Sequence, residues 1–106
     1  APTIQAPEQK PPTLAQELSF LDGAQQAMRQ GDSHRALMTL EEYEKTFPDG
    51  RTLDIEAHTL RIEALVKEGR VSEAKEAAAR FLDIYPHSVL AARVVATLQA
   101  IGKEKP

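Results

Sequence analysis

The residues most able to do chemistry in this chain of 106 residues are three histidines and four serines, because it contains no cysteine. His34, His58 and His87 lie far apart, and none has a second histidine or paired carboxylates at the spacing of a metal site. No serine stands in a Gly-x-Ser-x-Gly motif, and no glycine-rich loop could cradle a phosphate. The sequence therefore predicts a protein that is not an enzyme and that uses no metal or cofactor.

His58 supports the one catalytic alternative. The string Ala57-His58-Thr59-Leu60-Arg61, followed by Ala64, is similar to the motif of histidine phosphotransfer domains, in which an exposed histidine on a helix accepts a phosphoryl group. That resemblance implies a glycine after the basic residue, where this chain has Ile62, and Glu63 adds a negative charge near an anionic ligand. Both departures disfavour phosphoryl transfer, which depends on positioning and charge neutralisation. A phosphotransfer module that uses His58 stays an alternative.

Charge and hydropathy exclude two classes of partner. The chain carries 13 basic and 16 acidic side chains, for a net charge of -3, and its arginines are spread among acids. This is not the clustered positive stripe that binds nucleic acid. No stretch approaches the roughly 18 apolar residues needed to cross a bilayer. We therefore expect a protein partner or a second copy of the chain, without nucleic acid binding or membrane insertion by this segment.

One stretch occurs twice, and it determines the predicted fold. Gly31 to Pro48 and Gly69 to Pro86 carry glycine, alanine, aromatic residue and proline at equivalent places, always offset by 38 residues. A repeat of this length with helical periodicity is typical of stacked helix-turn-helix units. Composition agrees, since alanine, leucine, glutamate, glutamine and arginine favour helix. The chain is therefore expected to be all-α.

Five helices are expected. Thr13 and Gln16 can form a capping box for the first, Asp32 can cap the second, and Ser88 can cap the fifth. Gly31, Gly69 and Gly102 are positioned to end the first, third and fifth. The expected ranges are 13–31, 32–47, 53–68, 71–85 and 88–102, with a turn at Pro48-Asp49-Gly50. The predicted apolar faces comprise Leu14, Leu18, Leu21, Ala24 and Met28; Ala36, Leu37, Leu40, Tyr43 and Phe47; Leu53, Ala57, Leu60, Ala64 and Leu65; Val71, Ala74, Ala78, Phe81 and Tyr85; and Leu90, Ala91, Val94, Leu98 and Ile101.

Both units resemble tetratricopeptide repeats. The residues that carry the resemblance are Phe20, Gly23, Ala24, Ala27, Gly31, Asp32, Ala36, Leu40, Tyr43 and Pro48 in the first unit, and Leu65, Gly69, Ala74, Ala78, Phe81 and Pro86 in the second. The second unit departs by having Arg61 and Ile62 in place of Gly23 and Ala24, and the period exceeds the usual one of about 34 residues. The resemblance implies two antiparallel helix hairpins and a C-terminal capping helix, a fragment of a right-handed α-solenoid.

The resemblance also implies a non-catalytic adaptor, in which the first helix of each hairpin lines a concave groove for a peptide or partner helix. Carried over by position, the groove residues are Leu21, Gln25, Met28, Arg29, Glu56, Thr59, Glu63, Lys67, Arg93 and Thr97, with Leu18 beside them. Spacing supports this set independently, because Thr59, Glu63 and Lys67 step by four residues and project together. A self-association module that stacks through its first or last helix is another alternative.

The ends of the chain suggest a location. Residues 1–12 carry four of the seven prolines and are expected to form an extended, disordered linker ahead of a helical domain over 13–102 and a charged tail over 103–106. The ending Tyr85-Pro86-His87-Ser88, with Ala91 after it, is similar to that of tetratricopeptide proteins of the bacterial cell envelope. This resemblance, together with the linker, favours a periplasmic module tethered through its N-terminal tract.

Overall fold

The computed structural model describes residues 13–48 and 52–104, with side chains described up to residue 101. This part of the chain contains five α-helices and no strand, which confirms the all-α prediction. The helices are α1 (Leu14–Arg29), α2 (Ser33–Thr46), α3 (Asp54–Lys67), α4 (Val71–Ile84) and α5 (Ala91–Glu104). The predicted linker over 1–12 and most of the predicted turn at Pro48-Asp49-Gly50 lie outside the described residues.

The helix ends follow from local hydrogen bonds. The Gln16 N–H donates to Thr13 Oγ1 (3.2 Å) and the Thr13 N–H donates to Gln16 Oε1 (2.8 Å), so the capping box before α1 is confirmed. The Arg35 N–H donates to Asp32 Oδ1 at the start of α2 (3.1 Å). Gly31 and Gly69 have φ of 79° and 81°, the left-handed conformation in which glycine ends a helix at little cost.

The two turns also share one backbone pattern, which supports the duplication. The Asp32 N–H donates to the Ala27 carbonyl (2.8 Å), and the Arg70 N–H donates to the Leu65 carbonyl (2.9 Å). These bonds have the six-to-one spacing of a Schellman motif, which satisfies carbonyls left free at a helix end. The two bonds are related by the offset of 38 residues that relates the two units in the sequence.

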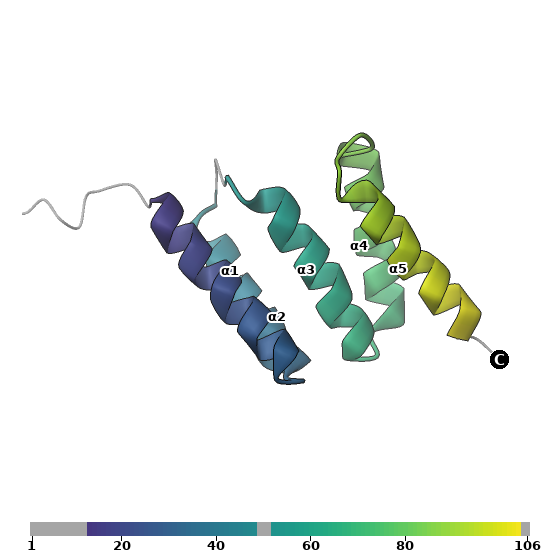
Figure 1. Cartoon of the computed structure of the whole chain (residues 1–106), viewed down its shortest axis with the longest axis horizontal. Helices are drawn as coiled ribbons and strands as arrows, with labels where there is room; N and C mark the ends of the chain where they lie inside the picture. The colour runs from purple at the N-terminus through teal and green to yellow at the C-terminus, as the bar shows by residue number, and fades with distance from the viewer. Residues whose placement is uncertain (1–12, 49–51, 105–106) are drawn as a thin grey trace, which may run out of the picture.

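The helices form two antiparallel hairpins and a single end helix (Figure 1). We call α1 with α2 hairpin 1 and α3 with α4 hairpin 2. In Figure 1, α1, α3 and α5 lie side by side across the front of the molecule, and α2 and α4 lie behind them. The α2 helix packs on α3, and both α3 and α4 pack on α5, so the hairpins share one interior. This is the arrangement of tetratricopeptide-like units.

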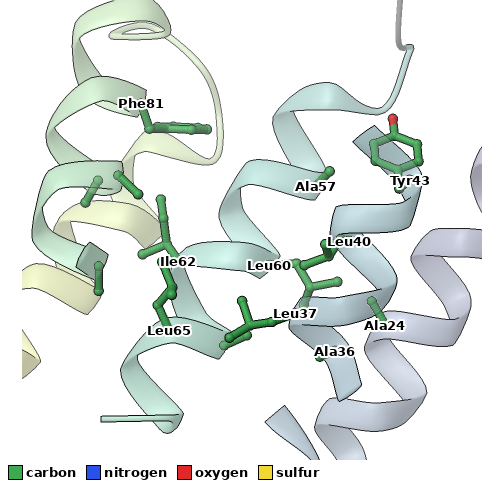
Figure 2. Close-up of a cluster of buried hydrophobic side chains, with 14 of the residues drawn as sticks. Ala24, Ala36, Leu37, Leu40, Tyr43, Ala57, Leu60, Ile62, Leu65 and Phe81 are labelled. Atoms are coloured by element: carbon green, nitrogen blue, oxygen red, sulfur yellow. The ribbon is translucent and has the colours of Figure 1, made fainter. Parts of the chain in front are cut away.

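One apolar core runs through both hairpins (Figure 2). Ala36 and Ala74, at equivalent places just after each turn, are completely buried, as the close approach of two helices requires. The large, fully buried side chains are Tyr43, Leu40, Ile62, Leu65 and Val94. These side chains come from α2, α3 and α5. The α4 helix contributes Phe81, which is 3% exposed.

Three details differ from the sequence predictions. Leu14 and Leu18 are 50% and 46% exposed rather than part of the core, because no helix covers that part of α1. Ile62 is buried, although the predicted apolar face of the third helix omits it. The α5 helix continues through Gly102 to Glu104, since a single glycine weakens a helix by only about 1 kcal/mol relative to alanine. Lys103 and Glu104 thus belong to α5 rather than to a separate tail.

Candidate functional site

Four of the predicted groove residues meet in one pocket. Gln25 on α1, Glu56 and Thr59 on α3, and Arg93 on α5 line a hollow of about 340 Å³, together with Leu60 and Leu90. These residues come from three helices that lie side by side (Figure 1). We call the surface formed by α1, α3 and α5 the groove face. Its pocket combines an apolar floor with acidic, basic and amide groups, the composition typical of a specific binding site.

Two further predicted residues line a second hollow on the same helices. Met28 at the end of α1 and Lys67 at the end of α3 border a space of about 220 Å³, with Gly31 and Ser33 at the turn of hairpin 1. Met28 is half-buried, and Lys67 is exposed. The groove face therefore has hollows near both ends of α3, one beside α5 and one beside the turn.

An ion pair connects α3 and α5 across the groove face. Arg93 donates from Nε to Glu63 Oε2 (2.6 Å) and from Nη2 to Glu63 Oε1 (2.8 Å). This hydrogen bonding raises the pKa of Arg93 above its ordinary value. The Thr97 hydroxyl donates to the Arg93 carbonyl one turn earlier (3.0 Å). Two of the predicted groove residues, Glu63 and Arg93, thus connect α3 to α5, and of the two only Arg93 also lines the first hollow.

The other predicted groove residues have different surroundings. Leu21 is buried in the core at 4% exposure and lines neither hollow. Thr59 is 3% exposed, and its hydroxyl donates to the Ile55 carbonyl (3.0 Å), so only its edge reaches the pocket. Arg29 is exposed beside Gln26 and also lines neither hollow.

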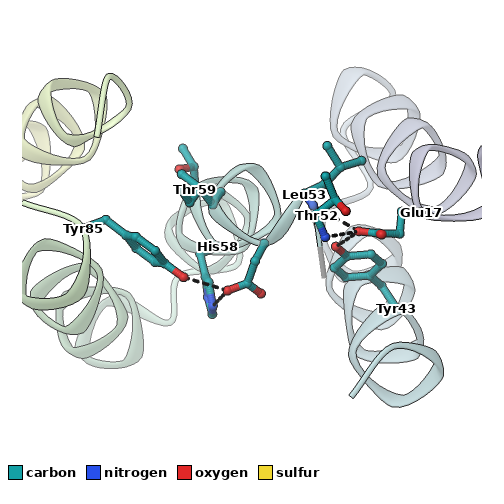
Figure 3. Close-up of polar contacts among 9 residues, drawn as sticks. Glu17, Tyr43, Thr52, Leu53, His58, Thr59 and Tyr85 are labelled. Carbon is teal, nitrogen blue, oxygen red and sulfur yellow. Dashed lines mark hydrogen bonds and ion pairs between the residues drawn. The ribbon is translucent and has the colours of Figure 1, made fainter. Parts of the chain in front are cut away.

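Glu17 is the buried charged residue that the sequence pattern did not reveal. Its side chain is 5% exposed, and its Oε1 accepts hydrogen bonds from the Tyr43 hydroxyl (2.8 Å) and from the N–H groups of Thr52 (2.9 Å) and Leu53 (3.0 Å) (Figure 3). Leu53 is the N-cap of α3 and has no side-chain hydrogen bond of its own. We call these four residues the Glu17 network. It joins both helices of hairpin 1 to the start of α3.

These contacts set the ionisation of Glu17. Burial alone raises the pKa of a carboxyl group, because it penalises the charged form. The hydrogen bonds from Leu53, Tyr43 and Thr52 outweigh burial and lower the pKa of Glu17 below its ordinary value of 4.5. The position near the positive end of the α3 dipole favours the same charged state. Glu17 is therefore a carboxylate at neutral pH, and its role is to connect structural elements.

His58 does not have the surroundings of a phosphoryl acceptor. Its Nε2 lies 3.4 Å from Asp54 Oδ2, and the Tyr85 hydroxyl donates to the same oxygen (2.9 Å) (Figure 3). We call these three residues the Asp54 network. A carboxylate beside the imidazole repels an incoming phosphoryl group. The phosphotransfer alternative gains no support from this geometry.

The described residues also bear on metal binding and on membrane crossing. Over residues 13–48 and 52–101, no three histidine, aspartate or glutamate side chains gather closely enough to hold a metal ion. None of the helices described combines the length and the apolar character that a membrane crossing requires.

The chain matches the model of a known protein family. The model of a family described as YfiO, outer membrane lipoprotein, matches residues 15–95. The match covers α1 to α4 and the first part of α5. No curated protein and no solved structure matches the chain.

Proposed function

Because the chain belongs to the YfiO family of outer membrane lipoproteins, we propose that it is a non-catalytic interaction module that holds a peptide or partner helix on its groove face. The family is of a protein-interaction type, and its name supports a location in the cell envelope. The tetratricopeptide-like fold agrees with such a role. Neither phosphotransfer by His58 nor self-association gains support from the family match.

The observation that carries the proposal is the pocket shared by α1, α3 and α5. Gln25, Glu56 and Arg93 are far apart in the sequence, yet they border one hollow with Leu60 and Leu90. An extended segment lying across the three helices could place an apolar side chain in this hollow and pair its backbone with the amide and charged groups around it. This combination suits a polypeptide better than a small charged metabolite.

Site-specific photocrosslinking in envelope fractions tests the proposal. A photoreactive amino acid replaces Gln25 or Glu56 on the groove face, and matched controls carry it at Glu42 on α2 or Glu76 on α4. All four positions are exposed, so the side chains can be replaced without opening the core. We expect one partner to crosslink from Gln25 and Glu56 and not from Glu42 or Glu76. Equal crosslinking from all four positions would contradict the proposal.

A charge variant provides the second arm of that experiment. The double variant Met28→Asp, Lys67→Glu changes the hollow beside the turn of hairpin 1. Lys67 is exposed, whereas Met28 is half-buried and packs against the core, so circular dichroism must first show that the helix content is unchanged. The same crosslinks should become weaker than in the parent protein. An unchanged crosslinking pattern would remove this end of the groove face from the proposed site.

A further inference from the structure

A third hollow lies between α3 and α4 and shares no lining residue with the two hollows of the groove face. It measures about 340 Å³. Its lining residues come from both helices of hairpin 2 and are basic, aromatic or aliphatic: His58, Arg61, Ala77, Arg80, Phe81, Ile84 and Tyr85. We call it the α3–α4 pocket. No acidic side chain lines it, in a chain whose net charge is -3.

The equivalent place in hairpin 1 holds three aromatic rings. There Phe20 packs against Tyr43 and Phe47, with ring centroids 6.1 Å and 5.8 Å apart, and the two latter rings are 5.3 Å from each other. Hairpin 2 keeps only the pair formed by Phe81 and Tyr85, at 5.3 Å, because the position equivalent to Phe20 holds His58. The smaller imidazole of His58 lines the hollow, and its Nε2 lies 3.4 Å from Asp54 Oδ2. Hairpin 2 therefore has a smaller ring at the position where hairpin 1 has a phenyl ring.

The charges differ between the two places as well. Arg61 stands where hairpin 1 has Gly23, and Arg80 stands where it has Glu42. Over the described residues, neither Arg61 nor Arg80 forms an ion pair or a side-chain hydrogen bond. Arg61 is half-buried and lies near enough to Glu73 to help lower the pKa of that carboxylate, whose hydrogen-bonded partner is Arg70. Because Arg61 forms no ion pair or side-chain hydrogen bond over the described residues, its guanidinium donors can still serve another acceptor.

The apolar wall of the pocket points to a second part of the ligand. Ile84 is 62% exposed beside Phe81 and Tyr85, although most large aliphatic side chains of hairpin 2 are covered. Exposed aliphatic and aromatic surface next to arginines that form no ion pair over the described residues is a combination that recurs at the centres of protein interfaces. The hollow is shallow and open to solvent, so it suits single side chains rather than a folded element.

We infer that the α3–α4 pocket binds an acidic side chain of a partner protein together with the apolar residue next to it. The carboxylate accepts hydrogen bonds from Arg61 and Arg80, as guanidinium groups favour. The neighbouring apolar side chain packs against Ile84 and Phe81. This site is separate from the groove face, so failure of the proposed groove function would leave it standing.

Nuclear magnetic resonance titration with short blocked peptides tests the inference. The probe is acetyl-Ala-Leu-Glu-Leu-Ala-amide, and its neutral match has glutamine in place of glutamate. We expect saturable shifts of the backbone amides around His58, Arg61, Arg80 and Ile84 with the acidic probe only. The double variant Arg61→Gln, Arg80→Gln should bind it about tenfold more weakly or not measurably, because charge-assisted bonds are lost.

Matched variants separate this site from general electrostatics and from misfolding. The control Lys45→Gln, Lys75→Gln removes the same charge from exposed positions outside the pocket and should leave binding unchanged. The single variant Arg80→Glu gives the pocket the charge that hairpin 1 has at Glu42. It should abolish binding while keeping the fold, because Arg80 is exposed.

Four results would overturn the inference. The first is that the glutamine peptide binds as tightly as the acidic probe. The second is that the lysine control weakens binding as much as the arginine double variant does. The third is that a glutamine peptide with a free C-terminal carboxylate binds as tightly as the acidic probe, which would assign the pocket to a chain end. The fourth is concentration-dependent self-association in sedimentation that disappears in the arginine double variant, which would assign the pocket to a second copy of the chain.

Discussion

Hairpin 1 and hairpin 2 have the same backbone plan but place bulk and charge differently. In hairpin 1 the small Ala24 on α1 is matched by the large Leu40 on α2, and both are buried. At the equivalent positions of hairpin 2, the large residue is Ile62 on α3 and the small one is Ala78 on α4, and both are again buried. Each hairpin thus buries one alanine and one large aliphatic residue at this pair of positions, but the large residue is on the second helix of hairpin 1 and on the first helix of hairpin 2.

The polar connections differ in the same way. Glu17 of hairpin 1 is replaced at its equivalent position by Ile55, and its partner Tyr43 by Phe81. Without a buried carboxylate, hairpin 2 positions the next helix by a local bond, in which the Leu90 N–H donates to Ser88 Oγ (3.0 Å). After both hairpins, a backbone N–H group at the start of the next helix donates to a side-chain oxygen. The residue that provides this oxygen differs between the two hairpins.

The largest predicted effect concerns the exchanged bulky residues. Ile62→Ala should lower the free energy of unfolding by about 2–5 kcal/mol, because it leaves a cavity at a site that is 2% exposed. Ala78→Leu should cost about 1–3 kcal/mol by overpacking. The double variant restores the arrangement of hairpin 1 and should lose clearly less than the sum of the single losses. Urea unfolding followed by circular dichroism measures all three, and strict additivity would show that the two positions do not compensate.

The Glu17 network should be the second most sensitive feature. Glu17→Ala removes the acceptor shared by the Tyr43 hydroxyl and two backbone N–H groups, which should cost about 1–3 kcal/mol. Asp54→Ala in hairpin 2 removes a more exposed carboxylate and should cost about 1 kcal/mol or less. Equal losses in the same urea experiment would mean that the buried network has no special role.

Acid should affect hairpin 1 through the same residue. The folded-state pKa of Glu17 lies below 4.5, so its stabilising contribution is complete above that pH and is lost as the pH falls through the folded-state value. The stability difference between the parent protein and Glu17→Gln should therefore shrink between neutral pH and about pH 3. Urea midpoints at both pH values measure it. A difference that stays constant would show that the charge of Glu17 contributes nothing.

The smallest predicted effect compares the two tyrosines. Tyr43→Phe removes a buried hydroxyl bonded to Glu17 and should cost about 1 kcal/mol. Tyr85→Phe removes a partly buried hydroxyl bonded to Asp54 and should cost less than about 1 kcal/mol, because water can replace it. Thermal unfolding of both variants ranks them, and the reverse order would contradict the account of the two networks.

Sequence reasoning predicted the helices well because their signals are local. The capping box at Thr13, the cap at Asp32 and the left-handed glycines 31 and 69 act within one turn of the residues that they affect. The offset of 38 residues then made the second hairpin follow from the first. Ile62 was left out of the predicted core because tetratricopeptide repeats have a small residue at that position. In this chain the larger Ile62 is accompanied by the smaller Ala78, at the position where hairpin 1 has Leu40.

The site was harder to predict, since it depends on contacts between distant residues. The family resemblance placed Gln25, Glu56 and Arg93 on one face, and the structure brings them around one hollow. The burial of Leu21 and Thr59 depends instead on how closely α1, α2 and α3 pack together. Glu17 resembled any exposed acid in the first turn of a helix. Its partners Thr52 and Leu53 lie about 35 residues away along the chain, and no periodicity links them to it.

The position of the Glu17 network has a mechanical consequence. It joins the starts of α1 and α3, whereas Met28 and Lys67 at the far ends of these helices border an open hollow. The two helices are therefore connected by hydrogen bonds at one end and separated by a hollow at the other. A ligand that forces them apart would widen the gap at the Met28 end, so thick and thin ligands would differ in how far along the helices they can settle.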